Sequence, residues 1–168
     1  MKMIKVRDNT VGSRSQTDLA YIAGFLDGDG SLMIQIKKRA GKLESGRSRF
    51  MLTICFYQDT RHEEPLHLIR EILGIGYVSR RSDGMSELRV NGFRQVKEVL
   101  LMLLPYIKFK KKQANAIIHA AELLSALGRG EQVLRDLVEI ILLVQSENYV
   151  TRKKRSREEL QTVLGLTP

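Results

Sequence analysis

Residues 22–30 read Ile-Ala-Gly-Phe-Leu-Asp-Gly-Asp-Gly, and this stretch determines how the rest of the chain is interpreted. Apolar residues recur through it and the preceding turn at the spacing of one helix face, which predicts a helix. The N-cap is expected at Thr17 or Asp18, because such side chains satisfy the free N–H groups of a first turn. Gly30 is expected to end the helix. The stretch therefore forms the acidic, glycine-rich end of a helix.

Small residues form a stripe along this predicted helix. Ala20, Gly24 and Gly28 lie four residues apart, so they fall on the same face. A second helix can approach such a face to backbone contact, which larger side chains would prevent. The stripe predicts a dimer interface, and the residues expected in it are Ala20, Gly24, Phe25 and Gly28.

Two carboxylates lie at the electrostatically unfavourable end of the helix. Asp27 and Asp29 occupy its C-terminal end, where the macrodipole already places negative charge. Carboxylates are disfavoured there unless a cation compensates them, so their position indicates a metal site. For Asp27 we expect a structural role instead, as a capping carboxylate.

The stretch 22–30 closely resembles the LAGLIDADG motif of homing endonucleases over nine consecutive positions, with conservative changes at the apolar ones. Only one copy of the motif is present, so the resemblance is to the single-motif, homodimeric branch of that family. It implies an α+β fold in the order αββαββα, with a saddle-shaped antiparallel sheet and additional C-terminal helices. A calcium loop or an ordinary turn is the alternative for an isolated Asp-Gly-Asp-Gly, and the preceding helix of small residues argues against both.

Length and charge favour a single domain that binds nucleic acid. The chain has 168 residues, of which 43% are hydrophobic, and this is enough for the core of one domain. We expect that domain over 16–168, after a flexible basic arm over 1–15. A net charge of +9 indicates a polyanionic partner, for which nucleic acid is the first candidate. A membrane is the competing partner, but no apolar run reaches the roughly 18 residues of a spanning helix.

The chemistry-bearing residues outside the motif exclude several classes of site. The single cysteine, Cys55, excludes an intrachain disulfide and a zinc cluster, and it is typical of a reducing, intracellular compartment. No Ser/His/Asp triad, paired Cys-x-x-Cys or nucleotide-cradling glycine loop competes for a catalytic role. The family resemblance alone points further, to an organelle, either the mitochondrion or the chloroplast.

After Gly30 the hydrophobic periodicity alternates between strand and helix spacing. It predicts, in chain order, strands over 31–39 and 48–58, a helix over 63–73, and strands over 77–81 and 87–91. Helices are predicted to follow over 93–104, from about 117 to 128, and over 131–147. A capping box at Ser156 is expected to begin a short last helix. Two hairpins with a helix between them are the order that the resemblance implies.

The outward faces of these hairpins predict contacts with DNA. They carry basic and amide side chains, which read base edges, and a two-stranded ribbon fits the major groove. Basic segments near 110 and 152–155 are expected to contact phosphates. Together the expected DNA contacts are Gln35, Lys37, Arg39, Arg49, Ser79, Arg81, Glu87, Arg89, Lys111, Arg152, Lys153 and Lys154. Solvated sheet faces and solvated lysine runs are the alternatives.

The expected catalytic residues are Asp29, Gln58 and Lys110. If the first hairpin turns near residues 43 and 44, Gln58 lies beside Asp29, where a polar side chain can position a water. Lys110 is assigned by resemblance only, to a family lysine near the scissile phosphate that stabilises charge in the transition state or orients a water. Relatives also tend to carry a second basic residue after the glutamine, and Arg61 and His62 both remain open for that role.

The expected metal site depends on two chains. One Asp29 per chain is too few for hydrolysis of a phosphodiester by a two-metal mechanism. Pairing two chains along the stripe would bring both Asp29 carboxylates together, so the active sites are expected to belong to a homodimer. Hard oxygen ligands and a phosphate substrate favour Mg²⁺, with the carbonyl of Gly28 as a further ligand by family analogy.

The predicted function is that of a site-specific endonuclease that cuts both strands of a long, pseudo-palindromic DNA target. The alternative is a non-cleaving nucleic-acid-binding protein of the same fold, either an intron maturase or a DNA-binding regulator. A cleavage assay with and without magnesium separates the two classes. A third class, a structural partner-binding protein, would leave the basic ribbon faces without a use.

Overall fold

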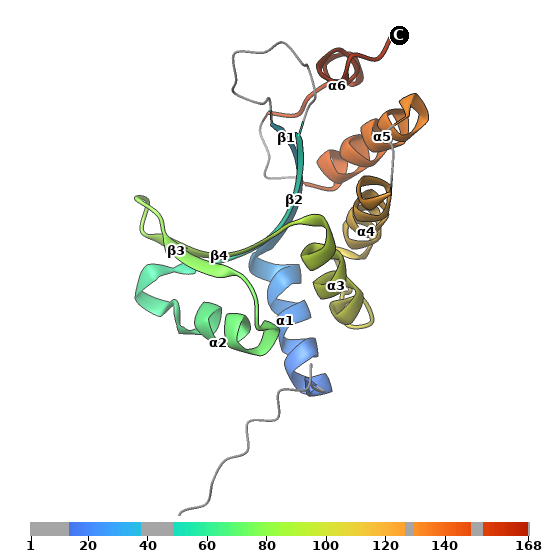
Figure 1. Cartoon of the computed structure of the whole chain (residues 1–168). Coiled ribbons are helices and arrows are strands. Elements are labelled where there is room, and N and C mark those ends of the chain that lie inside the picture. Colours follow the sequence, from blue (N-terminus) through green and yellow to red (C-terminus); the bar gives the residue numbers. More distant parts are fainter. Residues whose placement is uncertain (1–13, 38–48, 127–129, 149–152, 168) are drawn as a thin grey trace, which may run out of the picture.

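The computed structural model describes residues 14–37, 49–126, 130–148 and 153–167. In chain order its elements are α1 (Gln16–Asp29), β1 (Gly30–Lys37), β2 (Arg49–Asp59), a 3₁₀ helix (Thr60–His62), α2 (Glu64–Leu73), β3 (Tyr77–Arg80), β4 (Met85–Asn91), α3 (Phe93–Leu103), α4 (Lys111–Ser125), α5 (Glu131–Glu147) and α6 (Arg157–Leu164). This order confirms the predicted α+β arrangement αββαββα with additional C-terminal helices (Figure 1).

Helix α1 begins earlier than the sequence predicts and ends where expected. Its N-cap is Ser15, whose Oγ accepts a hydrogen bond from the backbone N–H of Asp18 at 3.0 Å, so the expectation of Thr17 or Asp18 is wrong. At the other end α1 passes into β1 without a loop, with Gly30 as the first strand residue. A Cβ on Gly30 would lie 2.7 Å from the carbonyl oxygen of Leu26, so the close turn from helix to strand requires glycine.

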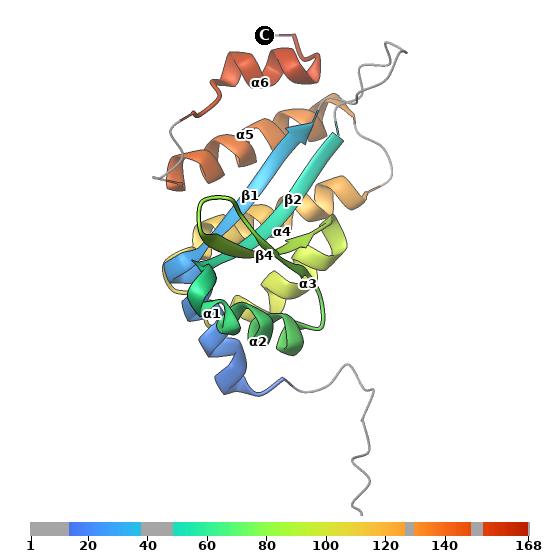
Figure 2. The same cartoon turned by 90° about the vertical axis from the view of Figure 1, so that its left-hand side faces the viewer.

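The four strands form one antiparallel sheet in the order β1-β2-β4-β3. β1 pairs with β2 along its whole length, with Gly30 opposite Phe56 and Lys37 opposite Arg49. Figure 1 shows the sheet as a curved band with helices α1 to α5 against its convex side, and Figure 2 looks toward the open, concave side. The predicted saddle-shaped sheet is therefore confirmed, and we call its concave side the outer face.

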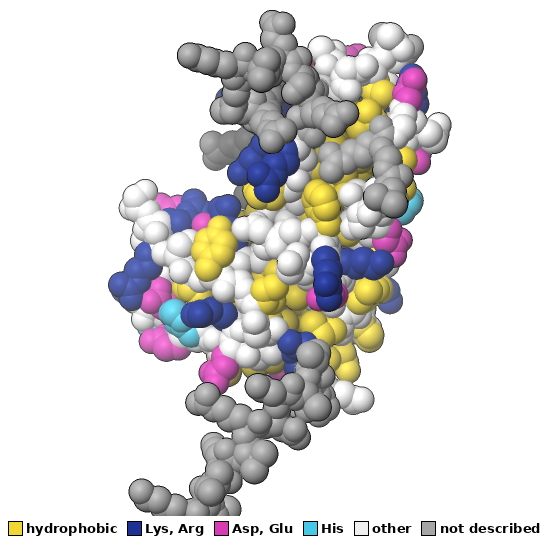
Figure 3. Space-filling model, in the orientation of Figure 1, with side chains coloured by type: hydrophobic (Ala, Val, Ile, Leu, Met, Phe, Trp, Pro, Cys, Tyr) yellow, Lys and Arg dark blue, Asp and Glu magenta, His cyan; other side chains and the backbone are white. Residues whose placement is uncertain are grey.

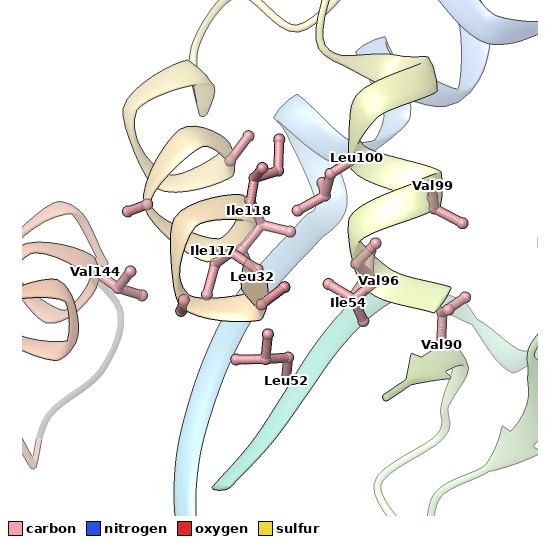
Figure 4. Close-up of a cluster of buried hydrophobic side chains, with 14 of the residues drawn as sticks. Leu32, Leu52, Ile54, Val90, Val96, Val99, Leu100, Ile117, Ile118 and Val144 are labelled. Atoms are coloured by element: carbon pink, nitrogen blue, oxygen red, sulfur yellow. The ribbon is translucent and has the colours of Figure 1, made fainter. Parts of the chain in front are cut away.

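The hydrophobic core lies between the convex side of the sheet and the helices. Alternate residues of β1 and β2 point inward, and among them Leu32, Leu52 and Ile54 are fully buried. Figure 4 shows these three side chains pointing from the strands toward the helices, where Ile117 of α4 and Leu100 of α3 meet them. Because a one-residue slip would move every one of these side chains to the other face, the core fixes the strand register.

The β3–β4 hairpin is held to the start of α2 by a polar contact with Glu63, the N-cap residue of that helix. Its turn contains Gly84 with φ +80°, and β4 begins at Met85, earlier than the predicted start at 87. Arg80, which interrupts the inward apolar pattern of β3, donates from Nη2 to Glu63 Oε1 at 2.6 Å. Ser86 Oγ donates to the other oxygen of Glu63 at 2.5 Å. Arg80 therefore has an acidic partner on the convex side of the sheet.

The C-terminal helices extend the convex layer to the edge strand β1. Asn148, just after α5, donates from Nδ2 to the carbonyl of Leu32 at 3.4 Å and accepts from Gln113 Nε2 of α4 at 3.0 Å. The predicted capping box is present, because Ser156 and Glu159 exchange hydrogen bonds at the start of α6. In the part of the chain that the structure describes, no helix is both long enough and apolar enough to span a membrane.

Candidate active site

The end of α1 is joined to the start of α4 by Asp27. Its Oδ2 accepts from the backbone N–H groups of Lys108 at 2.7 Å and Phe109 at 3.0 Å, and its Oδ1 accepts from the N–H of Lys110 at 2.9 Å. Partial burial raises the pKa of the Asp27 carboxyl, but these three donors and the nearby Lys110 charge outweigh burial and hold the pKa below its usual value. The expectation that Asp27 is a capping carboxylate is confirmed.

Lys110 is the buried cation of this region. Only 7% of the residue is exposed, and its Nζ donates to the backbone carbonyl of Asp27 at 2.6 Å. The Nζ also lies 5.2 Å from the ring centroid of Phe109. Burial lowers the pKa of the Lys110 ammonium, while the negative charges of Asp27 and Asp29 act in the opposite direction. The Lys110 ammonium is therefore within electrostatic range of the Asp29 carboxylate.

Asp29 is the last residue of α1, and both it and Gly28 are exposed. In contrast to Asp27, its carboxylate faces the surface at the point where helix becomes strand. Within the described ranges, no group of three or more His, Cys, Asp or Glu side chains is arranged to hold a metal ion. The donors that one chain brings to this point are the Asp29 carboxylate and the Gly28 carbonyl, and such hard oxygen donors fit a divalent cation such as Mg²⁺.

Gln58 does not lie opposite Asp29. Gly30 pairs with Phe56, so the residue across from position 29 is Tyr57, and the predicted register is wrong by one residue. Successive strand residues point to opposite faces of the sheet, so the side chains of Tyr57 and Gln58 point to opposite faces. A register error of one residue therefore changes which of the two side chains is paired across from position 29. Tyr57 forms a hydrogen bond of 3.1 Å between its hydroxyl and that of Ser31. Gln58 is further along β2, where its Oε1 accepts from the backbone N–H of Asp59 at 2.9 Å.

The two basic residues that follow Gln58 belong to the short 3₁₀ helix and are both exposed. Arg61 donates from Nη2 to Asp59 Oδ2 at 2.8 Å. This pairing holds the Arg61 guanidinium against Asp59, two residues earlier in the chain. His62 and Arg61 both remain candidates for the supporting basic residue.

The outer face of the sheet carries most of the side chains predicted to contact DNA. Lys37 at the end of β1 lies directly opposite Arg49 of β2, and both are exposed. Like charges opposite each other destabilise a sheet unless an anion compensates them, so this pair favours an anionic ligand. Figure 3 shows dark blue Lys and Arg side chains on both arms of the curved sheet. Arg39 and Arg152 lie outside the described residues.

Glu87 has an intramolecular role that the sequence did not reveal. Its side chain is 8% exposed on the outer face, where it accepts from Arg89 Nε at 2.7 Å. Ser79 Oγ donates to the same carboxylate at 3.5 Å, and Arg81 Nη1 lies 3.9 Å from it. Glu87 therefore holds the two arginines together at the surface, and its oxygens already have partners before any ligand binds.

A basic hollow of about 440 Å³ lies between β1, α5 and the segment before α6. Its cationic lining residues are Lys37, Lys153 and Arg155. The segment is fixed to α5, because Arg155 and Gln145 exchange two hydrogen bonds, of 2.8 and 3.2 Å. Lys153 and Arg155 both belong to the basic segment 152–155 that is expected to contact phosphates, and Lys153 is also among the DNA contacts expected by name. Lys154 and Lys111 are exposed, as expected for phosphate contacts.

The small-residue stripe of α1 is open. Ala20, Gly24 and Gly28 are exposed, and a Cβ added at either glycine would meet no atom within 4 Å. Phe25 is different, because it is half-buried and packs against Phe56 with ring centroids 6.2 Å apart. The stripe is thus open to a second helix, and Phe25 is only partly covered by its own chain.

Comparisons with known proteins show which family the chain is similar to. The family model described as LAGLIDADG endonuclease matches residues 22–120. The DNA endonuclease I-CvuI of Chlorella vulgaris is 41% identical over 103 residues, which span 61% of this chain and 63% of that protein. The DNA endonuclease I-CreI of Chlamydomonas reinhardtii is 28% identical over 148 residues, which span 87% of this chain and 88% of that protein.

The fold is also that of a solved member. The crystal structure of I-CvuI in complex with the I-CreI target in the presence of magnesium superposes with a TM-score of 0.73 and 30% sequence identity, and covers 92% of this chain and 96% of the I-CvuI chain. The family match covers more than half of the residues, including the motif, both hairpins and Lys110. The chain therefore belongs to the LAGLIDADG endonuclease family.

Proposed function

We propose that this chain is a homing endonuclease that hydrolyses phosphodiester bonds on both strands of a long, pseudo-palindromic DNA target. Similar proteins at 41% and 28% identity are named DNA endonucleases, and support for DNA as the substrate also comes from the chain itself. The outer face carries an opposed pair of cations, Lys37 and Arg49, and a basic hollow beside them. Backbone phosphates are the anions that such a surface attracts.

The observation that carries the proposal is the placement of Lys110. Its ammonium is nearly buried and hydrogen-bonded at the end of α1, within electrostatic range of the exposed Asp29. Burying a charge costs stability, so a buried ammonium beside an acidic surface residue favours a chemical role. A fixed cation at this point can stabilise the negative charge that develops on a phosphate during hydrolysis.

The proposed active unit is a homodimer that pairs two α1 stripes. The open space at Gly24 and Gly28 supports close approach of a second helix. Since Asp29 is the last residue of α1, two helices paired in this way would bring two Asp29 carboxylates to one place. The active sites would then be incomplete in a single chain.

In this proposal Asp29 and the Gly28 carbonyl hold Mg²⁺. The bound ion would polarise a phosphoryl oxygen and lower the pKa of a water ligand. The chain's own residues have separate tasks. Lys110 stabilises charge on the phosphate, and the outer face fixes the register of the DNA. Gln58 orients a water, a role that rests on the family resemblance because Gln58 does not lie opposite Asp29. A mitochondrial or chloroplast location stays a prediction from the family resemblance.

The test is cleavage of a randomised DNA library by the purified protein in magnesium, followed by sequencing of the products. We expect one enriched target with a cut on each strand, and no cutting in chelator. Asp29→Asn and Lys110→Met are the matched inactive controls. Retention of one DNA sequence without cutting in magnesium would overturn the proposal and identify a non-cleaving binder of the same fold.

A further inference from the structure

Two helix ends of opposite polarity meet at the candidate active site, and each carries charge of the unfavourable sign. Helix α1 ends with Asp27 and Asp29 and has no basic residue in its last turn. Helix α4 begins after Lys108 and Lys110 and has no acidic residue in its first turn. The macrodipole is negative at the end of α1 and positive at the start of α4, so both ends are destabilised by their own residues.

Helix α4 also lacks a local cap. Its N-cap residue is Lys110, a side chain without a hydrogen-bond acceptor, and it makes no side-chain cap. The N–H groups of Lys108, Phe109 and Lys110 are instead satisfied by the carboxylate of Asp27, from the other helix. The contact is returned, because Lys110 Nζ donates to the backbone carbonyl of Asp27 at 2.6 Å. Each helix end thus receives its counter-charge from the other.

We infer that Asp27 is a positioning residue for the reaction, which holds the Lys110 ammonium at a fixed place beside Asp29 through this reciprocal capping. The inference rests on the proposed endonuclease function. Asp27 itself has both oxygens occupied by backbone N–H groups, so it acts through Lys110 and not on the substrate. The Asp27–Lys110 pair links α1, which carries Asp29, to the start of α4. Among the described residues, the Asp27 side chain makes no hydrogen bonds other than those to Lys108, Phe109 and Lys110.

The chemistry of the carboxylate explains why the residue type matters. Two oxygens with four lone-pair positions can accept three N–H groups at once. An amide at position 27 would keep one acceptor oxygen, but its NH₂ group would face an N–H donor of the α4 start. The charge opposite the positive end of α4 would also disappear. The first turn of α4 would shift, and the Lys110 ammonium would move with it relative to Asp29.

The test uses Asp27→Asn in the full-length protein, with Asp18→Asn as the control. Asp18 lies in the first turn of the same helix, so the control makes the same chemical change far from Lys110. Single-turnover cleavage at saturating protein is compared with DNA affinity in chelator, and amide hydrogen exchange is followed at Lys108, Phe109 and Lys110. Asp27→Ser, whose hydroxyl can still accept from one N–H, is the milder second variant if Asp27→Asn folds poorly.

We expect Asp27→Asn to slow the cleavage step by roughly tenfold to a hundredfold, because a displacement of about 1 Å at a reacting group has this effect. DNA affinity in chelator should be unchanged, and the three amides should exchange faster. Asp18→Asn should cut at the native rate. Native-rate cleavage by both Asp27 variants despite faster exchange would overturn the positioning role. Absence of cleavage by the native protein would instead overturn the proposed function.

Discussion

Asp27 and Asp29 are separated by one glycine, yet at the scale of single residues they have opposite surroundings. The Asp27 carboxylate has three backbone donors, whereas Asp29 faces the surface at the end of α1. The sequence placed both at an unfavourable helix end and assigned them different roles. The structure supports that division, because the Asp27 carboxylate has three hydrogen-bond donors whereas Asp29 is exposed.

We predict that Asp29→Asn abolishes cleavage while folding and DNA binding persist. The amide keeps the shape of the side chain but is a much poorer metal ligand, and Asn tolerates the same local conformation. In chelator, DNA affinity should stay level or rise, because a negative charge next to phosphate is removed from each chain. Cleavage in magnesium and binding in chelator are measured on the native protein and the variant. Near-native cutting would remove Asp29 from the active site.

Glu63 gives a prediction for acid stability. Hydrogen bonds from Arg80 and Ser86 lower the pKa of its carboxyl from 4.5 to about 2. Because folding favours the charged form, Glu63 stabilises the folded chain above its unfolded pKa, and this contribution is lost as the pH falls toward about 2. Thermal unfolding of Glu63→Gln and native protein should therefore differ near neutral pH and converge in strong acid. A difference in melting temperature that is independent of pH would contradict this account.

At the scale of elements, the β3–β4 hairpin and the segment before α6 are predicted to contribute differently to DNA recognition. Arg89 is 31% exposed on the outer face and is oriented by Glu87, which is the arrangement that reads a base edge. Arg89→Ala should relax the preference at particular base pairs by about 1–3 kcal/mol. Arg81→Ala should act similarly, while Lys153→Ala should weaken binding to all sequences alike. Equal losses for all three variants over a panel of targets would place the hairpin on the DNA backbone.

Elements with a strong local pattern were predictable from the sequence, and pairings between elements were not. The bounds of α5 agree with the prediction at both ends, because its wide apolar stripe and glycine start are local signals. The register of β1 with β2 was wrong by one residue, since the composition of a loop does not determine its centre. The partner of Arg80 is Glu63, 17 residues earlier at the start of α2, so no local spacing in the chain reveals it.

At the scale of the whole molecule, we predict a dimer that Gly24→Leu disrupts. Space around Gly24 is open in the single chain, so the added side chain should leave the fold and its melting temperature unchanged. It would hold two α1 helices apart, and sedimentation should then show a monomer that no longer cuts DNA. His119→Leu, an exposed helical change on α4, is the control. An active, unaltered dimer of Gly24→Leu would exclude the stripe as the interface.

The absence of a loop between α1 and β1 has a consequence for the length of the DNA target. In the proposed dimer, the helix at the two-fold axis and the strand on the DNA form one rigid arm, since Gly30 follows Asp29 directly and is closely packed on Leu26. β1 reaches about 26 Å from that joint, so a tilt of one degree moves its far end by only about half an ångström. An extra base pair at the centre of the target separates the half-sites by about 3.4 Å and rotates them by a tenth of a turn. The rigid arm cannot follow this change, so the dimer recognises only one spacing between half-sites. A target with an extra central base pair should therefore bind no better than a single half-site.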